Sequence, residues 1–232
     1  AYVEHRKEIN SIYAIIPLIV LKSDDGKNKL WDEEKIKKAI KWFYYSQIRS
    51  RYVYGLPAKL DHDLNIIRES NQPFDDLLSV IEEERVLKIS PDEFEGTGVG
   101  SPLWSMMKWC FKSKKALCLT TGVNILNNNI GKKYQLERDH IFPKSKLREL
   151  ENNFSNRKKN QLINEITNMA LLTQLANRQK SDQSAKSYLK AVKEKFPNAL
   201  SLQFIPENEG LWDIDNYEEF LKTRRKLLAD EI

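Results

Sequence analysis

Apolar residues recur at helical spacing through the first half of the chain. The first apolar stripe predicts a helix over residues 4–21. Asp32 then has the character of an N-cap, with two glutamates behind it, and predicts a helix that runs to about residue 54. Further helices are predicted over residues 58–70 and 73–88. Ser101, which is followed by proline, predicts the start of another short helix.

The pattern changes near residue 116, where short β-type segments begin. Three of these segments are strand candidates, over residues 116–120, 134–139 and 167–172. An asparagine-rich run at residues 127–131 has the composition of a turn. Residues 174–195 and 215–229 return to helical spacing. We therefore predict an α+β chain that is mostly α, with a helical domain over residues 1–115 and a second domain over residues 116–232.

The composition agrees with a folded, mostly helical protein. Hydrophobic residues make up 41% of the 232 residues, and glycine and proline number only eight each. The net charge of +5 is unevenly spread, because residues 132–195 hold 15 Lys and Arg against 7 Asp and Glu, a local balance of +8. This excess favours a surface that binds a polyanion, and an ordinary solvated face is the alternative.

The cysteine content and the apolar runs exclude several classes of protein. Cys110 and Cys118 are eight residues apart, which fits neither a redox pair nor a disulfide framework, so we expect buried thiols in a reducing, cytoplasmic setting. The apolar run at residues 11–21 is too short to span a bilayer and contains Pro17, so no membrane association is expected. The chain begins in helical pattern without an initiator Met, which predicts a fragment of a longer protein, and a trimmed terminus is the alternative.

The segment around Asp139 and His140 carries the clearest chemical signal. Successive side chains of a strand point to opposite faces, so one of these residues can bind a metal while the other faces a substrate. Further along, Asn168 opens an apolar strand candidate, and Asn177 follows it by nine residues. In a helix, Asn177 and Lys180 share a face. Strand, loop, strand and helix with these residues are typical of a ββα-metal site.

These motifs resemble the HNH nucleases in their His-Asn-Asn form. The shared pattern is Asp-His-Ile-x-Pro-x-Ser, then Asn, then Asn-Arg-x-Lys-Ser-Asp. It is similar to the HNH domain of CRISPR RNA-guided DNA endonucleases. It is more similar to the carboxyl-terminal HNH domain of the DUF262/DUF1524 proteins, which include GmrSD-type modification-dependent restriction enzymes and related phage-defence nucleases. The motif match covers about residues 134–190, and the gap between His140 and Asn168 is longer than in the CRISPR nucleases.

The resemblance implies a role for each residue of the motif. Asp139 and Asn177 would bind a divalent metal, and His140 would take a proton from the attacking water. Asn168 would hold the loop and the histidine ring by hydrogen bonds. One charged and one neutral oxygen ligand suit a hard cation, so the expected cofactor is Mg²⁺ or Mn²⁺. A neutral imidazole suits a general base near neutral pH.

A basic insert at residues 144–160 lies within the motif. We expect phosphate contacts from this insert and from the segment after Asn177, through Lys144, Lys146, Arg148, Arg157, Lys158, Lys159, Arg178 and Lys180. A pair of solvated helices is the alternative for the insert.

Together these features predict a metal-dependent DNA endonuclease that makes nicks or double-strand breaks. The resemblance implies the effector part of a modification-dependent restriction or anti-phage protein, with a nucleotide-hydrolysing sensor domain upstream of this chain. An HNH centre that cuts one strand makes a double-strand break when two copies act together, so a homodimer is a further expectation. Two alternatives stay open at this stage: a non-catalytic nucleic-acid-binding module and a nuclease that acts on RNA.

Overall fold

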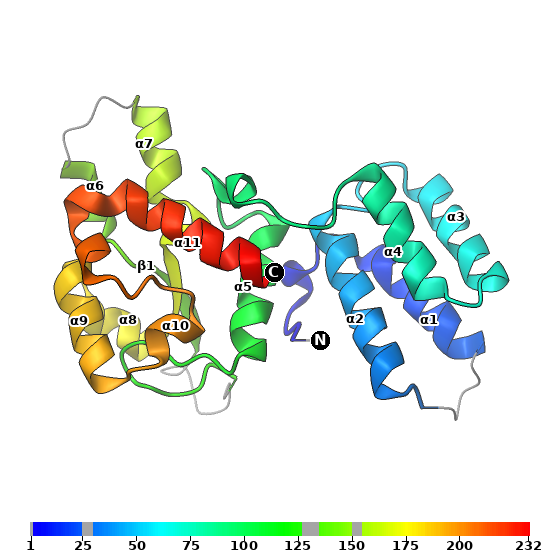
Figure 1. The fold of residues 1–232 in the computed structure, drawn as a ribbon, viewed down its shortest axis with the longest axis horizontal. Helices are drawn as coiled ribbons and strands as arrows, with labels where there is room; N and C mark the ends of the chain where they lie inside the picture. The colour runs from blue at the N-terminus through cyan, green and yellow to red at the C-terminus, as the bar shows by residue number, and fades with distance from the viewer. Residues whose placement is uncertain (1, 25–29, 127–134, 150–154) are drawn as a thin grey trace. The chain divides into compact units, whose positions relative to one another are not determined.

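The computed structural model describes residues 2–24, 30–126, 135–149 and 155–232, and it divides into two compact units (Figure 1). The first unit covers residues 1–88 and the second covers residues 89–232. The division therefore comes earlier in the chain than the boundary that the sequence predicted near residue 115. The predicted turn at residues 127–131 lies outside the described residues.

Helix α5 (Pro102–Ser113) and the segment before it belong to the second unit because their partners lie there. The Phe111 ring stacks on Phe204, with 6.0 Å between the ring centroids. The backbone N–H of Ile166 donates to the carbonyl oxygen of Thr97 at 2.8 Å. These contacts join residues far apart in the sequence, so the local pattern that placed the boundary near residue 115 did not contain them.

Over residues 2–24 and 30–88, the first unit contains four helices. These are α1 (Ile15–Asp24), α2 (Glu33–Ile48), α3 (Leu56–Glu69) and α4 (Pro73–Glu84), and they follow two 3-10 turns, η1 (Arg6–Glu8) and η2 (Ile12–Ala14). Asp32 caps α2 as predicted, since its carboxylate accepts a hydrogen bond from Lys35 N at 2.7 Å. Helix α2 ends before the predicted residue 54, because Ser50 adopts φ 57° and the chain turns there.

Buried polar groups tie the end of α2 to α3. The guanidinium of Arg51 donates to both carboxylate oxygens of Asp63, at 3.2 and 2.7 Å, and both side chains are almost fully buried. The Tyr52 hydroxyl also donates to Asp63. Glu84 of α4 forms a further ion pair with Arg51. This network holds the segment after α2 against α3 and α4.

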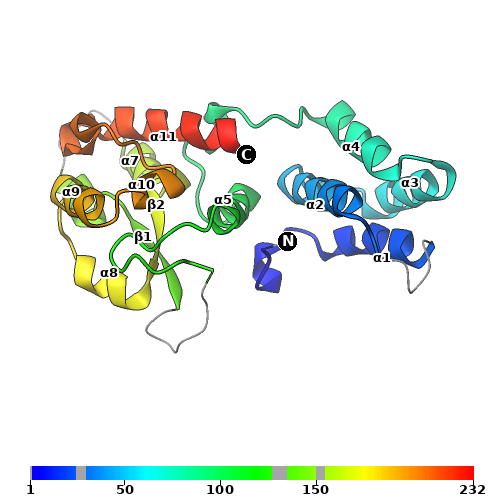
Figure 2. The same cartoon turned by 60° about the horizontal axis from the view of Figure 1, so that its bottom comes forward.

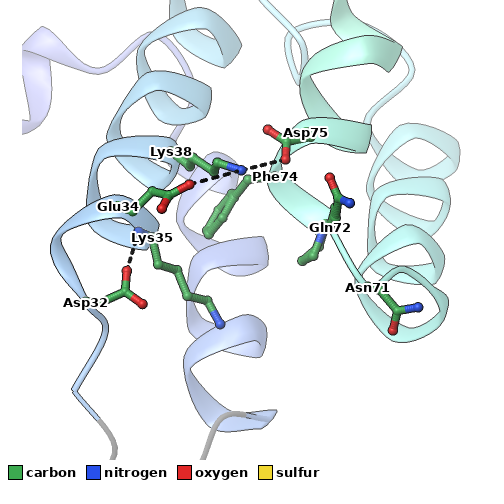
Figure 3. Close-up of a pocket in the computed structure, with 9 residues that line it drawn as sticks. Asp32, Glu34, Lys35, Lys38, Asn71, Gln72, Phe74 and Asp75 are labelled. Carbon is green, nitrogen blue, oxygen red and sulfur yellow. Dashed lines mark hydrogen bonds and ion pairs between the residues drawn. The ribbon is translucent and has the colours of Figure 1, made fainter.

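The starts of α2 and α4 border a hollow in the first unit (Figure 3). Lys38 reaches across it, with its Nζ 2.7 Å from Asp75 Oδ2 and 3.8 Å from Glu34 Oε1. These charged groups thus pair with one another. The predicted site residues all belong to the second unit, so this hollow is not part of the candidate site.

A two-stranded antiparallel sheet lies in the second unit. Strands β1 (Leu136–His140) and β2 (Met169–Thr173) pair so that Asp139 lies opposite Ala170. The connection between them contains α6 (Lys144–Glu149), α7 (Asn156–Ile163) and the 3-10 turn η5 (Ile166–Asn168). Helix α8 (Gln174–Lys180) follows β2 and contacts both strands (Figure 2). The prediction of a mostly helical chain with a small sheet is confirmed.

Two predicted elements of the second unit differ from the structure. The strand candidate at residues 116–120 is reduced to an isolated bridge between Leu117 and Asn124. The single helix predicted over residues 174–195 is two helices, α8 and α9 (Ala185–Lys195). Helix α8 ends because Ser181 adopts φ 50°, a conformation that helical residues do not take.

Gln203 takes the place of a third strand beside β2. Its Oε1 accepts a hydrogen bond from Leu171 N at 2.9 Å, and its Nε2 donates to Leu171 O at 2.9 Å. The same Nε2 donates to Leu117 O at 2.8 Å. This fully buried side chain therefore satisfies backbone groups that an edge strand would leave unpaired.

Helix α11 (Tyr217–Glu231) closes the second unit, close to the predicted range of 215–229 (Figure 1). Its Arg224 is fully buried, and the guanidinium donates to the carbonyl oxygens of Thr167, Met169, Gln203 and Phe204 at 2.6–3.1 Å. Burial lowers the pKa of Arg224 to about 9. Two of these carbonyls flank Asn168, so α11 fixes the start of β2.

The other helices and turns in the described part of the second unit are short. They are η3 (Pro91–Phe94), α10 (Ala199–Leu202), η6 (Glu209–Trp212) and η7 (Ile214–Asn216). Across the described ranges, no helix combines the length and the apolar character needed to cross a membrane.

Candidate metal and catalytic site

The candidate site lies where β1 meets α8. Because side chains alternate along a strand, Glu137 and Asp139 share one face of β1, and this face meets α8. Asn177 Nδ2 lies 2.9 Å from Glu137 Oε2, and Lys180 Nζ lies 2.6 Å from Asp139 Oδ2. Asn177 and Lys180 are three residues apart on α8 and so share a helix face. The structure thus brings two carboxylates of β1 against an amide and an ammonium of α8.

Lys180 lies inside the site and not on the surface that we predicted for phosphate binding. The residue is 3% exposed. Besides Asp139, its ammonium donates to the backbone oxygen of His140, and it lies 5.3 Å from the centre of the Tyr188 ring. A buried ammonium needs such partners, because leaving it unpaired would cost several kcal/mol. The expected phosphate contact by Lys180 is therefore corrected to a contact with Asp139.

His140 projects from the opposite face of β1. Its Nε2 lies 3.4 Å from Asn164 Oδ1, at the end of α7. Burial lowers the pKa of His140 below its ordinary value of 6.5, while the hydrogen bond to Asn164 and the charge of Asp139 act in the opposite direction. The neutral imidazole is therefore favoured, and its neighbour is Asn164 where we had expected Asn168.

Asn168 holds the loop that follows β1. The residue is fully buried, and its Oδ1 accepts a hydrogen bond from Phe142 N at 3.0 Å. Its Nδ2 donates to Phe142 O at 3.3 Å and to Ile163 O at 3.1 Å. Its backbone oxygen also accepts from Ile141 N at 2.7 Å. One side chain thus fixes the end of α7 and the turn after His140.

Two residues of the site, Glu137 and Asn164, were missed from the sequence. Glu137 carried a usable signal, because it precedes Asp139 by two residues and therefore shares its strand face. Asn164 carried no such signal. It lies 24 residues after His140 in the sequence, and only the position of α7 brings the two side chains together.

The basic residues of the insert, and Arg178 of α8, differ in how exposed they are to solvent. Lys146, Arg148, Arg157 and Arg178 are exposed, and Lys144 is half-buried. Lys158 is paired with Glu95, with 2.6 Å between Nζ and Oε1. Lys159 Nζ donates to the backbone oxygen of Arg148 at 2.9 Å. The exposed side chains on α6, α7 and α8 are therefore the better candidates for phosphate contacts.

The donors of the site fit a hard divalent cation. Asp139 and Asn177 supply a carboxylate oxygen and an amide oxygen, and Glu137 adds a second carboxylate nearby. Mg²⁺ prefers such oxygen ligands and usually keeps several waters. Within the described residues, no three His, Cys, Asp or Glu side chains come together as a complete set of protein ligands. A centre with two protein ligands would leave its other positions to water and phosphate.

Comparison with known proteins places most of the second unit in a family. The profile of the family described as GmrSD restriction endonucleases, C-terminal domain, matches residues 111–229, which are 119 of the 232 residues. Neither the comparison with curated proteins nor the comparison with solved structures gave a match. The matched residues contain the sheet, α8, the basic insert and most of α11. The chain therefore belongs to the GmrSD restriction endonuclease family, in which residues 111–229 form the C-terminal domain.

Proposed function

We propose that the second unit is a metal-dependent DNA endonuclease of the HNH, ββα-metal type. The observation that carries this proposal is that Asp139 and His140 project from opposite faces of β1. Asp139 faces α8, which presents Asn177 on the same side, and His140 faces away with a half-buried imidazole. Membership of a restriction endonuclease family supports the same activity.

Each residue has a distinct part in this proposal. Asp139 and Asn177 would hold Mg²⁺ or Mn²⁺, and the ion would neutralise charge that develops on the phosphate and the leaving oxygen. His140 would accept a proton from the attacking water, which its lowered pKa permits near neutral pH. Asn168 would keep the loop after His140 in place. Exposed basic side chains beside the site would bind flanking phosphates of DNA.

The setting of this unit in a longer protein is also a proposal. The family is one of restriction enzymes, and this supports an effector part that acts in the cytoplasm on foreign or modified DNA. A nucleotide-hydrolysing sensor domain encoded upstream would supply the recognition. Two copies acting together would convert two nicks into a double-strand break.

A plasmid assay tests the activity. Supercoiled DNA is incubated with the chain and Mg²⁺ or Mn²⁺, with EDTA and the variant His140→Ala as controls. We expect metal-dependent nicking that is lost in the variant, in Asn177→Ala and in EDTA. DNA retardation without cleavage would favour the non-catalytic binding module, and cleavage of single-stranded RNA in preference to DNA would favour an RNA nuclease. Full activity of Asn177→Ala would show that Asn177 is not a metal ligand.

A further inference from the structure

The side chain of Glu137 on β1 makes two hydrogen bonds to side chains of α8. Its Oε2 accepts from Asn177 Nδ2 at 2.9 Å, and its Oε1 accepts from Gln174 Nε2 at 3.2 Å. Both donors lie on α8, three residues apart, so the carboxylate bridges one turn of the helix. Glu137 is half-buried and is the nearest carboxylate to Asp139 along β1.

These contacts determine which way the amide of Asn177 faces. An ionised carboxylate accepts hydrogen bonds and does not donate them, so it selects the NH₂ side of an amide. The Oδ1 of Asn177 is therefore turned away from Glu137, and it accepts no hydrogen bond from the described side chains. Oδ1 is also the atom that a hard cation requires, because an amide nitrogen is not a ligand for Mg²⁺.

The carboxylate of Asp139 on β1 is likewise oriented by a side chain of α8. Lys180 of α8 occupies its Oδ2 at 2.6 Å, which leaves Oδ1 with its lone pairs for another partner. Each of the two proposed ligands is thus oriented by a charged residue on the opposite element. Asp139 of β1 is oriented by Lys180 of α8, and Asn177 of α8 is oriented by Glu137 of β1.

We propose that Glu137 is a positioning residue that fixes the amide of Asn177 with its Oδ1 presented as a metal ligand. This inference rests on the proposed metal centre, and Glu137 itself is not a ligand in it. Partners that orient ligands in this way typically contribute a factor of about 10–100 to metal affinity.

The test measures Mn²⁺ binding to the full chain, from the electron paramagnetic resonance signal of free Mn²⁺. We expect Glu137→Gln to weaken binding about tenfold, because glutamine can donate to Oδ1 and hold it away from the ion. Glu137→Asp keeps the charge but withdraws the carboxylate from Asn177, and we expect a similar loss. Glu194→Gln, an exposed residue of α9, is the matched control for the loss of one negative charge and should bind Mn²⁺ as the unchanged chain does.

The same substitution in a second variant, Asn177→Asp, separates the effect of Glu137 on the orientation of residue 177 from the effect of its charge. In Asn177→Asp both oxygens are equivalent, so the side chain needs no orienting partner. We expect Glu137→Gln to change Mn²⁺ affinity by less than about threefold there, and this difference between backgrounds isolates the pairwise effect. Far-ultraviolet circular dichroism of every variant checks that the fold is kept. If Glu137→Gln does not fold, the comparison is made with Glu137→Asp.

The outcomes separate this inference from the function on which it rests. An equal loss in both backgrounds would mean that Glu137 acts as a ligand or through its charge, and this would overturn the inference. Unchanged affinity in Glu137→Gln, or in Glu137→Asp alone, would overturn it as well, while the metal centre itself would stand. If Asp139→Asn and Asn177→Ala bind Mn²⁺ as the unchanged chain does, both the metal centre and the inference are overturned.

Discussion

Asn168→Ala is the substitution whose cost follows most directly from the structure. The fully buried side chain makes three hydrogen bonds, to the N–H and the carbonyl oxygen of Phe142 and to the carbonyl oxygen of Ile163. Truncation to alanine leaves these three backbone groups without their partner. An unsatisfied buried polar group costs about 1–3 kcal/mol, and a water that enters the vacated space would recover part of this.

We therefore expect Asn168→Ala to lower the free energy of unfolding of the second unit by about 3 kcal/mol. Asn168→Asp should cost at least as much, because its second carboxylate oxygen would face the carbonyl oxygens of Phe142 and Ile163. Asn160→Ala on the exposed side of α7 is the matched control, and a change within about 0.5 kcal/mol is expected for such a surface position.

Urea unfolding followed by tryptophan fluorescence measures this change. With a slope of about 2 kcal/mol per molar urea, a loss of 3 kcal/mol moves the midpoint by about 1.5 M. DNA nicking should fall in parallel, because the turn after His140 loses its anchor. Lost cleavage with an unchanged urea midpoint would refute this reasoning, since Asn168 would then act on the reaction and not on the loop.

Three further predictions concern other contacts of the second unit. Arg225→Met removes a guanidinium whose Nε and Nη2 each lie 2.7 Å from an oxygen of the fully buried Glu165. Thermal and urea unfolding should record a loss of about 3 kcal/mol in the free energy of unfolding, because the buried carboxylate loses its charged partner, and an unchanged midpoint would contradict this. Gln203→Leu leaves the N–H and the carbonyl oxygen of Leu171 unpaired. We expect urea unfolding to show a loss of about 2–3 kcal/mol in the free energy of unfolding. An unchanged urea midpoint would contradict the role of this side chain in place of a third strand. Arg178→Ala should reduce the slope of log affinity for DNA against log salt concentration by about one, measured by fluorescence anisotropy, whereas an unchanged slope would exclude a phosphate contact at this exposed residue.

The sequence by itself determined those features that depend on local periodicity. Strand alternation assigned Asp139 and His140 to opposite faces of β1, and helical spacing assigned Asn177 and Lys180 to one face of α8. Capping chemistry located the start of α2 at Asp32. These inferences need only the neighbouring residues, because a strand repeats every two residues and a helix every 3.6.

The tertiary structure alone decided which of these groups meet. The sequence suggested that Lys180 binds phosphate, but burial against Tyr188 and Asp139 makes it an internal partner of the site. Asn164 lies beside His140, while Asn168 turns toward Phe142 and Ile163.

The division at residue 88 likewise follows from contacts such as that between Thr97 and Ile166, which no local pattern encodes. Such pairings depend on how whole elements pack, since a buried charge or amide takes its partner from whichever element the fold brings within hydrogen-bonding distance.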